Sequence, residues 1–470
     1  MNFKNALQRR RVLPFLLCAL SASPWAALQA GPPRSGLALP TTPHTSARTG
    51  AHPLDGMPAL PPAQVTVVGT GRVLLPSQLV RSVWQRNQGI AAMRAAAAGA
   101  QAKIQSADAL DDPTVSYAIA PETAGSYSVP NQNLQVSQAF PWPGTLYLRR
   151  KVATATAQSA DEQVADLRLR LAANARADYA QWYYVHRALA INAQNQALVA
   201  RLRKVAEAAY ASGQSPQQDV LQADVELVRL SNQALELGRL QRTVQAKIDA
   251  LQNLPPATDV LPPADLPAEV PLPAEAALQK IALARHPALK SLDARVSASR
   301  SGVELAHKGY YPKINVVAGY NSIMDMPAKR LTVGVAFSIP FGGNHRGEVG
   351  AADARLRESE AKRADARSQL LSDIDQSYAT ATQAVATIRL YRGKLLPLAK
   401  LNLQAAEADY SGGNGDFLKL ITAEQEDLQA RLELARARAD FYTQLASLNY
   451  QTGGSLWPTP VSATQAEANP

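Results

Sequence analysis

The chain has 470 residues, of which 46% are hydrophobic and 18% charged, and its net charge is +10. Four of the cations stand near the start of the chain, up to Arg11, and the others are spread among acids, a distribution that does not indicate a nucleic-acid-binding protein. The only cysteine is Cys18. Disulfides therefore cannot hold the chain together, and a large helical or sheet assembly must do so.

The N-terminal segment, 1–30, has the order of a secretory signal peptide. Lys4 and three arginines precede an apolar run at 12–20, and the small residues that follow end at Leu28-Gln29-Ala30, a suitable cleavage site. We predict that this segment is removed. Beyond it no run approaches the roughly 20 apolar residues that a membrane-spanning helix needs. Any passage of the mature chain through a membrane must therefore use strands.

Pro-rich stretches divide the rest of the chain. The stretch after the signal peptide is rich in Pro, Thr, Ser and Gly and has no apolar period, which predicts a flexible leader. A second Pro-rich stretch separates two long alanine-rich blocks and is interpreted as a linker between repeats. The predicted organisation is a leader at 31–75, a first repeat at 76–254, a linker at 255–273, a second repeat at 274–452 and a flexible tail at 453–470.

The two blocks match each other at a nearly constant offset. Pro113 pairs with Pro312 and Tyr210 pairs with Tyr410, so the shift changes by a single position between these two pairs. Self-similarity held over so much chain indicates a duplicated unit. We predict that each copy follows the order helix, strand, strand, long helix, turn, helix.

The strands are indicated by period-two alternation. Apolar side chains at every second position of 331–339 are separated by small or polar ones, and 314–320 continues the pattern. Segments 115–119 and 134–140 repeat it more weakly in the first copy. Such strands face lipid on one side and a wet interior on the other, or they form a soluble half-buried hairpin, which the pattern alone favours.

The helices are predicted to be unusually long. No proline occurs between 145 and 209, so one helix of about 65 residues is expected, close to 100 Å at about 1.5 Å per residue. The matching helix at 344–410 contains Pro397, which should kink it. In the last helix, apolar residues recur every seven positions from Ile421 to Tyr442, which indicates a coiled-coil seam.

Proline and glycine mark the expected junctions between strands and helices. Pro113 and Pro312 are expected to close a helix and open a strand, because proline lacks the helical donor and biases its predecessor toward extended geometry. Any one such residue is common in ordinary loops, but four segments at matched positions favour a repeated junction between strand and helix. The predicted junction residues are Pro113, Pro141, Pro143, Gly144, Pro312, Pro340, Gly342 and Gly343.

Two turns, at 210–219 and 410–416, each end one helix with glycine and begin another. Ser215-Pro216 and Asp416 are the expected caps of the helices that follow. Structurally these are plain hairpin turns, and they gain a functional meaning only if they crowd together at the far end of a tunnel. The predicted tip residues are Gly213, Ser215, Asp219, Gly413 and Gly415.

These features resemble the outer membrane efflux proteins, the TolC-like family. The resemblance covers most of residues 76–452, through the duplicated Tyr-x-x-Gly turns, the aligned Leu-x-Ala at 221–223 and Ile-x-Ala at 421–423, and the Gln-Ala-Phe-Pro-Trp-Pro-Gly segment at 138–144. It implies a mainly α fold with a small β part, in which a homotrimer joins an α-helical barrel to a 12-stranded transmembrane β-barrel, with four strands per protomer. It also implies the outer-membrane channel of a tripartite efflux system.

The resemblance further implies the surroundings of such a channel: outer-membrane lipid, a periplasmic adaptor protein and an inner-membrane pump. The second tip would line a gate, often with acidic residues on the following helix. This sequence departs there, because Lys419 and Thr422 follow Asp416 at the gate positions. From the residues alone, four strands of about ten residues cannot close a membrane barrel, so the protomers must associate. The number three comes from the resemblance.

No enzyme signature is found. The six histidines do not cluster, and neither a metal site nor a cofactor site is predicted. Two other classes of protein remain open: a periplasmic adaptor, which also uses long helical hairpins, and a purely structural coiled-coil protein. The first usually carries other domains around a single hairpin, and the second would leave the duplicated strands unexplained.

Overall fold

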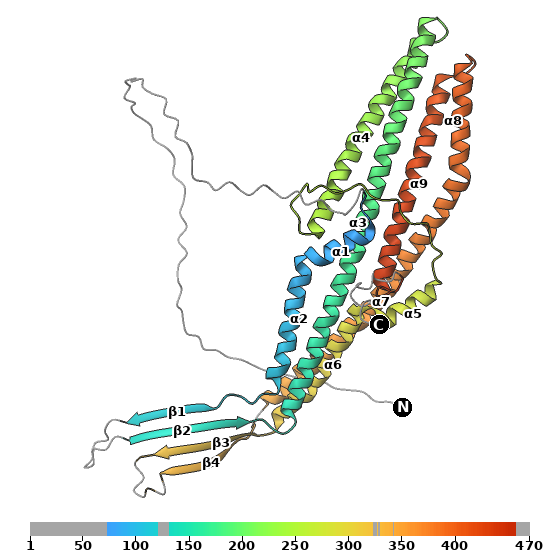
Figure 1. Cartoon of the computed structure of the whole chain (residues 1–470). Coiled ribbons are helices and arrows are strands. Elements are labelled where there is room, and N and C mark those ends of the chain that lie inside the picture. The colour runs from blue at the N-terminus through green and yellow to red at the C-terminus, as the bar shows by residue number, and fades with distance from the viewer. Residues whose placement is uncertain (1–72, 121–130, 323–326, 328–329, 342, 457–470) are drawn as a thin grey trace, which may run out of the picture. The chain divides into compact units, whose positions relative to one another are not determined.

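Figure 1 shows the computed structural model, which describes residues 73–456 apart from 121–130, 323–326, 328–329 and 342. The predicted signal peptide, the leader up to residue 72, Gly342 and the tail from residue 457 lie outside this part. The described chain is mainly helical with one small sheet, so the expected mainly α class is confirmed. Its elements are α1 (Pro76–Arg86), α2 (Gln88–Ala107), β1 (Thr114–Ala120), β2 (Asn131–Phe140), α3 (Thr145–Ala211), α4 (Gln217–Leu251), α5 (Glu275–Arg285), α6 (Pro287–His307), η1 (Lys308–Tyr310), β3 (Lys313–Asn321), β4 (Leu331–Ser338), α7 (Asn344–Leu390), η3 (Tyr391–Leu395), α8 (Leu396–Ser411) and α9 (Phe417–Gln451).

The elements themselves repeat at the offset found in the sequence. The first residues of α1 and α5, and those of β1 and β3, are separated by the same number of positions as Pro113 and Pro312. For α4 and α9 the separation is greater by one position. Both copies differ from the expected order in the same way, because two α-helices and not one precede the strands. The breaks fall at Asn87 and His286, which correspond at the same shift as the two prolines, and both have extended backbones.

Local chemistry explains these two breaks. Asn87 accepts a hydrogen bond from the backbone N–H of Gly89, and His286 accepts one from that of Ala288, so each side chain caps the helix that follows. His286 also precedes Pro287, which disfavours helical geometry at the preceding residue.

The four strands form one antiparallel sheet in the order β1-β2-β3-β4. The pairing of β2 with β3 joins the two copies, while β1 and β4 lie at the edges. The sheet lies at one end of the long helices, and the turns that link α3 to α4 and α8 to α9 lie at the other (Figure 1). The sheet and the turns are therefore the two ends of one elongated helical body.

Helix α3 runs without interruption for 67 residues, as its lack of proline predicts. It packs against α2, α4, α6 and α9. Tyr179, near its middle, is fully buried, and its hydroxyl lies 3.0 Å from the carbonyl oxygen of Leu74 and 2.9 Å from that of Ala264. Leu74 falls in the predicted flexible leader, but it is fully buried and forms a parallel bridge with Pro263. The leader is thus anchored at its last residues.

The helix that matches α3 in the second copy is interrupted. A π-helical turn, η3, separates α7 from α8, and Pro397 lies in the first turn of α8. A proline ring clashes with the carbonyl four residues earlier, here that of Gly393 inside η3, and the wider π turn accommodates it. The disturbance expected from Pro397 therefore takes the form of a π turn.

The predicted seam of α9 is buried. Ile421, Leu428, Ala435 and Tyr442 are each at most 7% exposed. They belong to different apolar clusters along the molecule, so α9 contributes to the core over most of its length. The seam includes a small residue, Ala435, and such residues allow α9 to pack closely against α3.

Candidate functional site

One face of the sheet is largely apolar and uncovered. The strand register places apolar side chains of all four strands in common rows, such as Tyr117, Leu134, Tyr320 and Leu331. Within the described residues nothing buries this face, which contradicts a half-buried soluble hairpin. So large an exposed apolar surface marks contact with a membrane or a partner. The large side chains on it, 37–74% exposed, are Val115, Tyr117, Ile119, Leu134, Val136, Phe140, Val316, Tyr320, Leu331, Val333, Val335 and Phe337.

The opposite face is small and polar. It carries Ser116, Gln135, Asn315 and Thr332, among others, in the alternate positions of the same strands. At both edges the backbone groups of β1 and β4 have no partner strand among the described residues. Open edges are ready to pair with another chain. The sheet therefore has one apolar face, one polar face and two open edges with which another chain can pair.

The predicted junction residues lie where the strands meet the helices. Pro113 and Pro312 each come directly before a strand, β1 or β3. Pro113 does not close a helix, because α2 has already ended at Ala107, and this part of the expectation is wrong. Pro141 and Pro143 lie between β2 and α3, and Pro340 lies between β4 and α7.

The junctions of the two copies contact each other. The ring of Trp142 stacks on that of Tyr311, with centroids 5.0 Å apart and planes inclined by 16°. Lys308 places its ammonium group 5.3 Å from the centre of the Tyr311 ring. Aromatic side chains at the base of the strands are typical of the interface between a membrane and water.

Two of the predicted junction glycines, Gly144 and Gly343, differ in backbone conformation, which gives a prediction with an internal control. Gly144 begins α3 with φ of +86°, a left-handed conformation, whereas Gly343 has φ of −80° and open space around it. Gly144→Ala should lower the free energy of unfolding by about 1–2 kcal/mol, since a Cβ is strained there. Gly343→Ala should change it by less than about 0.5 kcal/mol. Denaturant unfolding of both variants followed by circular dichroism checks this, and equal losses would contradict it.

The predicted tip residues come together at the far end of the helices. Gly213 and Gly413 both have left-handed backbones, with φ of +72° and +76°, and end α3 and α8. A Cβ on Gly415 would lie 2.5 Å from the backbone nitrogen of Tyr410, so only glycine fits. A groove of about 410 Å³ lies between the two turns and is lined by side chains and backbone of both, including Ser215, Asp219, Gly413, Gly415 and Asp416.

One hydrogen bond links the two tips directly. The hydroxyl of Tyr410 donates to Oδ2 of Asp219 over 3.1 Å, and the Tyr410 ring packs edge-on against Phe417, which is 1% exposed. Burial and this contact with Asp219 raise the pKa of Tyr410, so the hydroxyl remains a donor near neutral pH. The tip of the first hairpin is thus fastened to the tip of the second.

The expected caps are confirmed only in part. Asp416 caps α9 by accepting a hydrogen bond of 2.9 Å from the backbone N–H of Leu418. Ser215 does not cap α4, because the residue before that helix is Pro216 and no side chain caps its first turn. Asp416, Lys419 and Thr422 are all exposed in the single chain. They therefore lie on a free surface of the tip, where the gate was predicted.

Behind this surface lies a set of buried carboxylates that the sequence analysis missed. Glu226, Glu424 and Asp427 are 4%, 0% and 1% exposed. A signal was present, because Glu424 stands between Ile421 and Leu428 on the apolar seam of α9, where a charged residue is unexpected.

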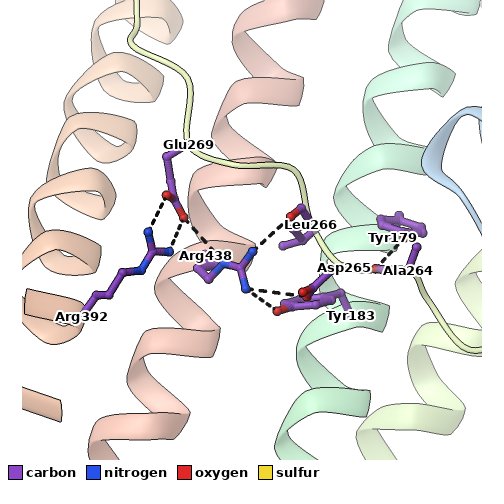
Figure 2. Close-up of polar contacts among 8 residues, drawn as sticks. All are labelled: Tyr179, Tyr183, Ala264, Asp265, Leu266, Glu269, Arg392 and Arg438. Carbon is purple, nitrogen blue, oxygen red and sulfur yellow. Dashed lines mark hydrogen bonds and ion pairs between the residues drawn. The ribbon is translucent and has the colours of Figure 1, made fainter. Parts of the chain in front are cut away.

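The linker between the repeats is fastened to the helices by a second polar network (Figure 2). Glu269 receives two hydrogen bonds from Arg392 in the π turn, of 2.8 and 3.0 Å, and lies 3.6 Å from Nε of Arg438 on α9. Arg438 also donates to the hydroxyl of Tyr183 over 2.7 Å and to the carbonyl oxygen of Leu266 over 3.1 Å. We call Glu269, Arg392, Arg438 and Tyr183 the linker clamp.

The linker clamp joins four parts of the chain: α3, the linker, the π turn η3 and α9. Burial opposes ionisation of Glu269, but the hydrogen bonds from Arg392 and the nearby charge of Arg438 lower its pKa overall, so it stays charged near neutral pH. Bidentate arginine–carboxylate pairs of this kind fix geometry as well as adding energy. The clamp thus ties the π turn of the second hairpin to the linker and to α9.

None of the helices in the described ranges is both long and apolar enough to cross a membrane. Over the same ranges, no group of three or more His, Cys, Asp or Glu side chains is placed to hold a metal ion.

Comparison with known sequences finds one family. Residues 278–454 match the model of the family described as outer membrane efflux protein. The chain is 26% identical over 186 residues to the alkaline protease secretion protein AprF of Pseudomonas aeruginosa, covering 38% of each chain. It is 26% identical over 170 residues to the pyoverdine export outer membrane protein OpmQ of Pseudomonas putida, covering 33% of this chain and 36% of that protein. The matched segments thus span less than two fifths of these curated relatives.

Solved structures show the same fold over most of the chain. The outer membrane protein VceC of Vibrio cholerae superposes with a TM-score of 0.69 at 18% identity, covering 81% of this chain and 96% of that one. The outer membrane channel CmeC of Campylobacter jejuni superposes with a TM-score of 0.70 at 12% identity, covering 83% and 88%. The sheet, the long helices and their turns together therefore form the fold of these channels.

Proposed function

The chain belongs to the outer membrane efflux protein family, and from that premise we propose that it is the outer-membrane channel of a tripartite export system. The observation that carries the proposal is the sheet, which presents an uncovered apolar face, a polar face and two open edges. In this proposal lipid covers the apolar face and water fills the space beside the polar face. Neighbouring copies of the chain pair with the two open edges. The protein is located in the outer membrane, with its helices extending into the periplasm.

In a homotrimer, every open strand edge of the sheet finds a partner strand. Pairing β4 of each protomer with β1 of the next removes every open edge, and three sheets of four strands close a 12-stranded β-barrel. The helices need partners as well. Leu221, Val225, Val228 and Leu235 form an apolar stripe on α4 at coiled-coil spacing and are 55–74% exposed. Such a stripe fits the flank of a neighbouring copy, so that the helices close a second, α-helical barrel.

The tips are the proposed site of partner docking and gating. They carry the groove between the two turns and the exposed residues Asp416, Lys419 and Thr422. A periplasmic adaptor that inserts there would separate Tyr410 from Asp219 and let α8 and α9 move away from α3 and α4. The chain itself performs no chemistry in this scheme. An inner-membrane pump supplies the energy, and the channel needs no cofactor.

Membrane fractionation and planar-bilayer recording test the proposal. We expect the full chain in the outer-membrane fraction, extracted by detergent as a heat-sensitive trimer that conducts ions. A soluble monomer without conductance would refute it. A soluble trimer would instead favour the adaptor class.

The relatives are named for different cargoes, a protease for AprF and pyoverdine for OpmQ. We propose a continuous passage for this chain and no cargo-binding site. Its specificity would come from the pump and adaptor that dock on it.

A further inference from the structure

A polar layer interrupts the apolar core of the tip half of the molecule. Asn195 of α3, Glu226 of α4, and Glu424 and Asp427 of α9 meet there, and each is at most 4% exposed. Apolar side chains pack on both sides of the layer. Toward the tip these include Leu202, Ala223, Leu420 and Ala423, and away from the tip they include Ile191, Leu230, Leu428 and Leu432.

The hydrogen bonds within the layer leave two carboxylate oxygens without partners. Asn195 donates to Oε1 of Glu424 over 2.7 Å, and Gln425 donates to Oε2 of Glu226 over 2.7 Å. Oε2 of Glu424 and Oδ1 of Asp427 are buried and have no hydrogen-bond partner among the described residues. An ionised carboxylate buried in this way carries a large cost.

The cations at the layer form ion pairs with Glu226 and Asp427, whereas no ion pair is formed by Glu424 among the described residues. Arg431 of α9 lies 2.7 Å from Asp427, and Arg229 of α4 lies 3.7 Å from Glu226. Both guanidinium groups reach out toward solvent. Glu424 faces Glu226 and Arg229 from α4, Asp427 from its own helix, and only the neutral Asn195 from α3.

We propose that this polar layer is a proton-operated joint, in which protonated Glu424 holds α9 against α3 and α4 and loss of the proton loosens the tip half. A neutral carboxyl brings no charge into the buried layer, so its burial costs far less than that of the ionised form. The ionised form instead adds a third negative charge to a buried cluster with two peripheral cations. The joint would regulate the proposed gate, and its meaning for export rests on the proposed function.

The direction of the pH dependence follows from the environment of Glu424. Burial first, and then the charges of Glu226 and Asp427, raise its pKa to about 7, against the opposing effects of Asn195 and Arg229. Between the ordinary pKa of glutamate and about 7, the closed tip binds more protons than the opened one. The closed tip therefore loses stability as pH rises through this window and keeps its full stability below it.

Hydrogen exchange of the detergent-solubilised full chain tests the joint. Protection factors, corrected for the intrinsic pH dependence of exchange, should fall at least about tenfold between about pH 5 and about pH 8 for amides of α9 near Glu424. Glu424→Gln replaces the acid with a neutral group of the same shape and should remove this fall. Glu426→Gln, an exposed neighbour on the same helix, should leave it unchanged.

A second variant keeps the test decisive if Glu424→Gln fails to fold. Glu226→Gln removes a neighbouring negative charge, so the midpoint of the fall should move to lower pH. A flat wild-type profile, or a fall that persists in Glu424→Gln, would overturn the joint. Bilayer conductance separates the joint from the proposed function. A conducting trimer whose protection factors do not change with pH would refute only the joint. A chain whose protection factors fall with pH but which does not conduct ions would refute only the channel.

Discussion

Replacing Val335 with arginine should prevent the chain from accumulating as a trimer in the outer membrane. Val335 lies in the middle of β4, is 55% exposed, and pairs across the sheet with Val316 on the same apolar face. Arginine on the lipid face of a membrane barrel costs about 2–4 kcal/mol near the bilayer centre. In a homotrimer this cost is incurred three times. Quantifying heat-sensitive trimer in the outer-membrane fraction measures the effect.

The adjacent residue provides the matched control. Ala336 follows Val335 but points to the polar face, where it pairs with Asn315. Ala336→Arg should assemble at close to the wild-type level and alter the ion selectivity of the pore, because its charge lies in water. Loss of assembly in both variants, or in neither, would contradict the assignment of the two faces.

Arg438→Met should release the linker from the helices. Arg438 and Glu269 have side chains only 21% and 18% exposed, and the substitution leaves Glu269 with a single cation and the carbonyl of Leu266 without its donor. Breaking a buried charged network costs about 3–5 kcal/mol, and the partial exposure here favours the lower end, about 3 kcal/mol. Amide exchange of Leu74 and Ala264, which pair the leader with the linker, should accelerate on the order of 100-fold.

Arg436→Met serves as the control for this variant. Arg436 is on the same helix, two positions earlier, but its side chain is 63% exposed and its Nε lies as far as 4.0 Å from the carboxylate of Asp440. Exposed pairs contribute at most about 1 kcal/mol, so little change is expected. If both variants behaved alike, the clamp would have no special role. The double variant Glu269→Gln with Arg438→Met should cost less than the sum of the two, because the residues share one network.

Sequence patterns were sufficient where the relevant contacts are close along the chain. The absence of proline predicted α3, heptad spacing predicted the buried seam of α9, and alternation predicted the strands. Gly213, Gly413 and Asp416 were recognised because the left-handed turn and the cap that they form are local. The duplicated unit was visible because both copies kept these local signals at matching positions.

Local patterns failed where a packing partner makes the choice. The split between α1 and α2 depends on an asparagine cap that looks like an ordinary helix residue in sequence. Ser215 is a favourable cap residue, yet the chain turns so that Pro216 occupies the position directly before the helix. Proline in the long helix predicts a bend near Pro397, and the structure has a π turn there, a type of turn that the local pattern does not specify.

The amino-acid pattern alone is enough to recognise the duplication, the kind and length of the main elements, and the resemblance to a family of channels. Three features emerge from the folded chain and not from the pattern: the apolar sides of all four strands share one uncovered face, Glu269 fastens the linker to the π turn, and three carboxylates meet inside the tip half. The physical reason is range: helix and strand formation depends on residues a few positions apart, whereas Glu226 and Glu424, or Glu269 and Arg438, become neighbours only when packing brings helices together.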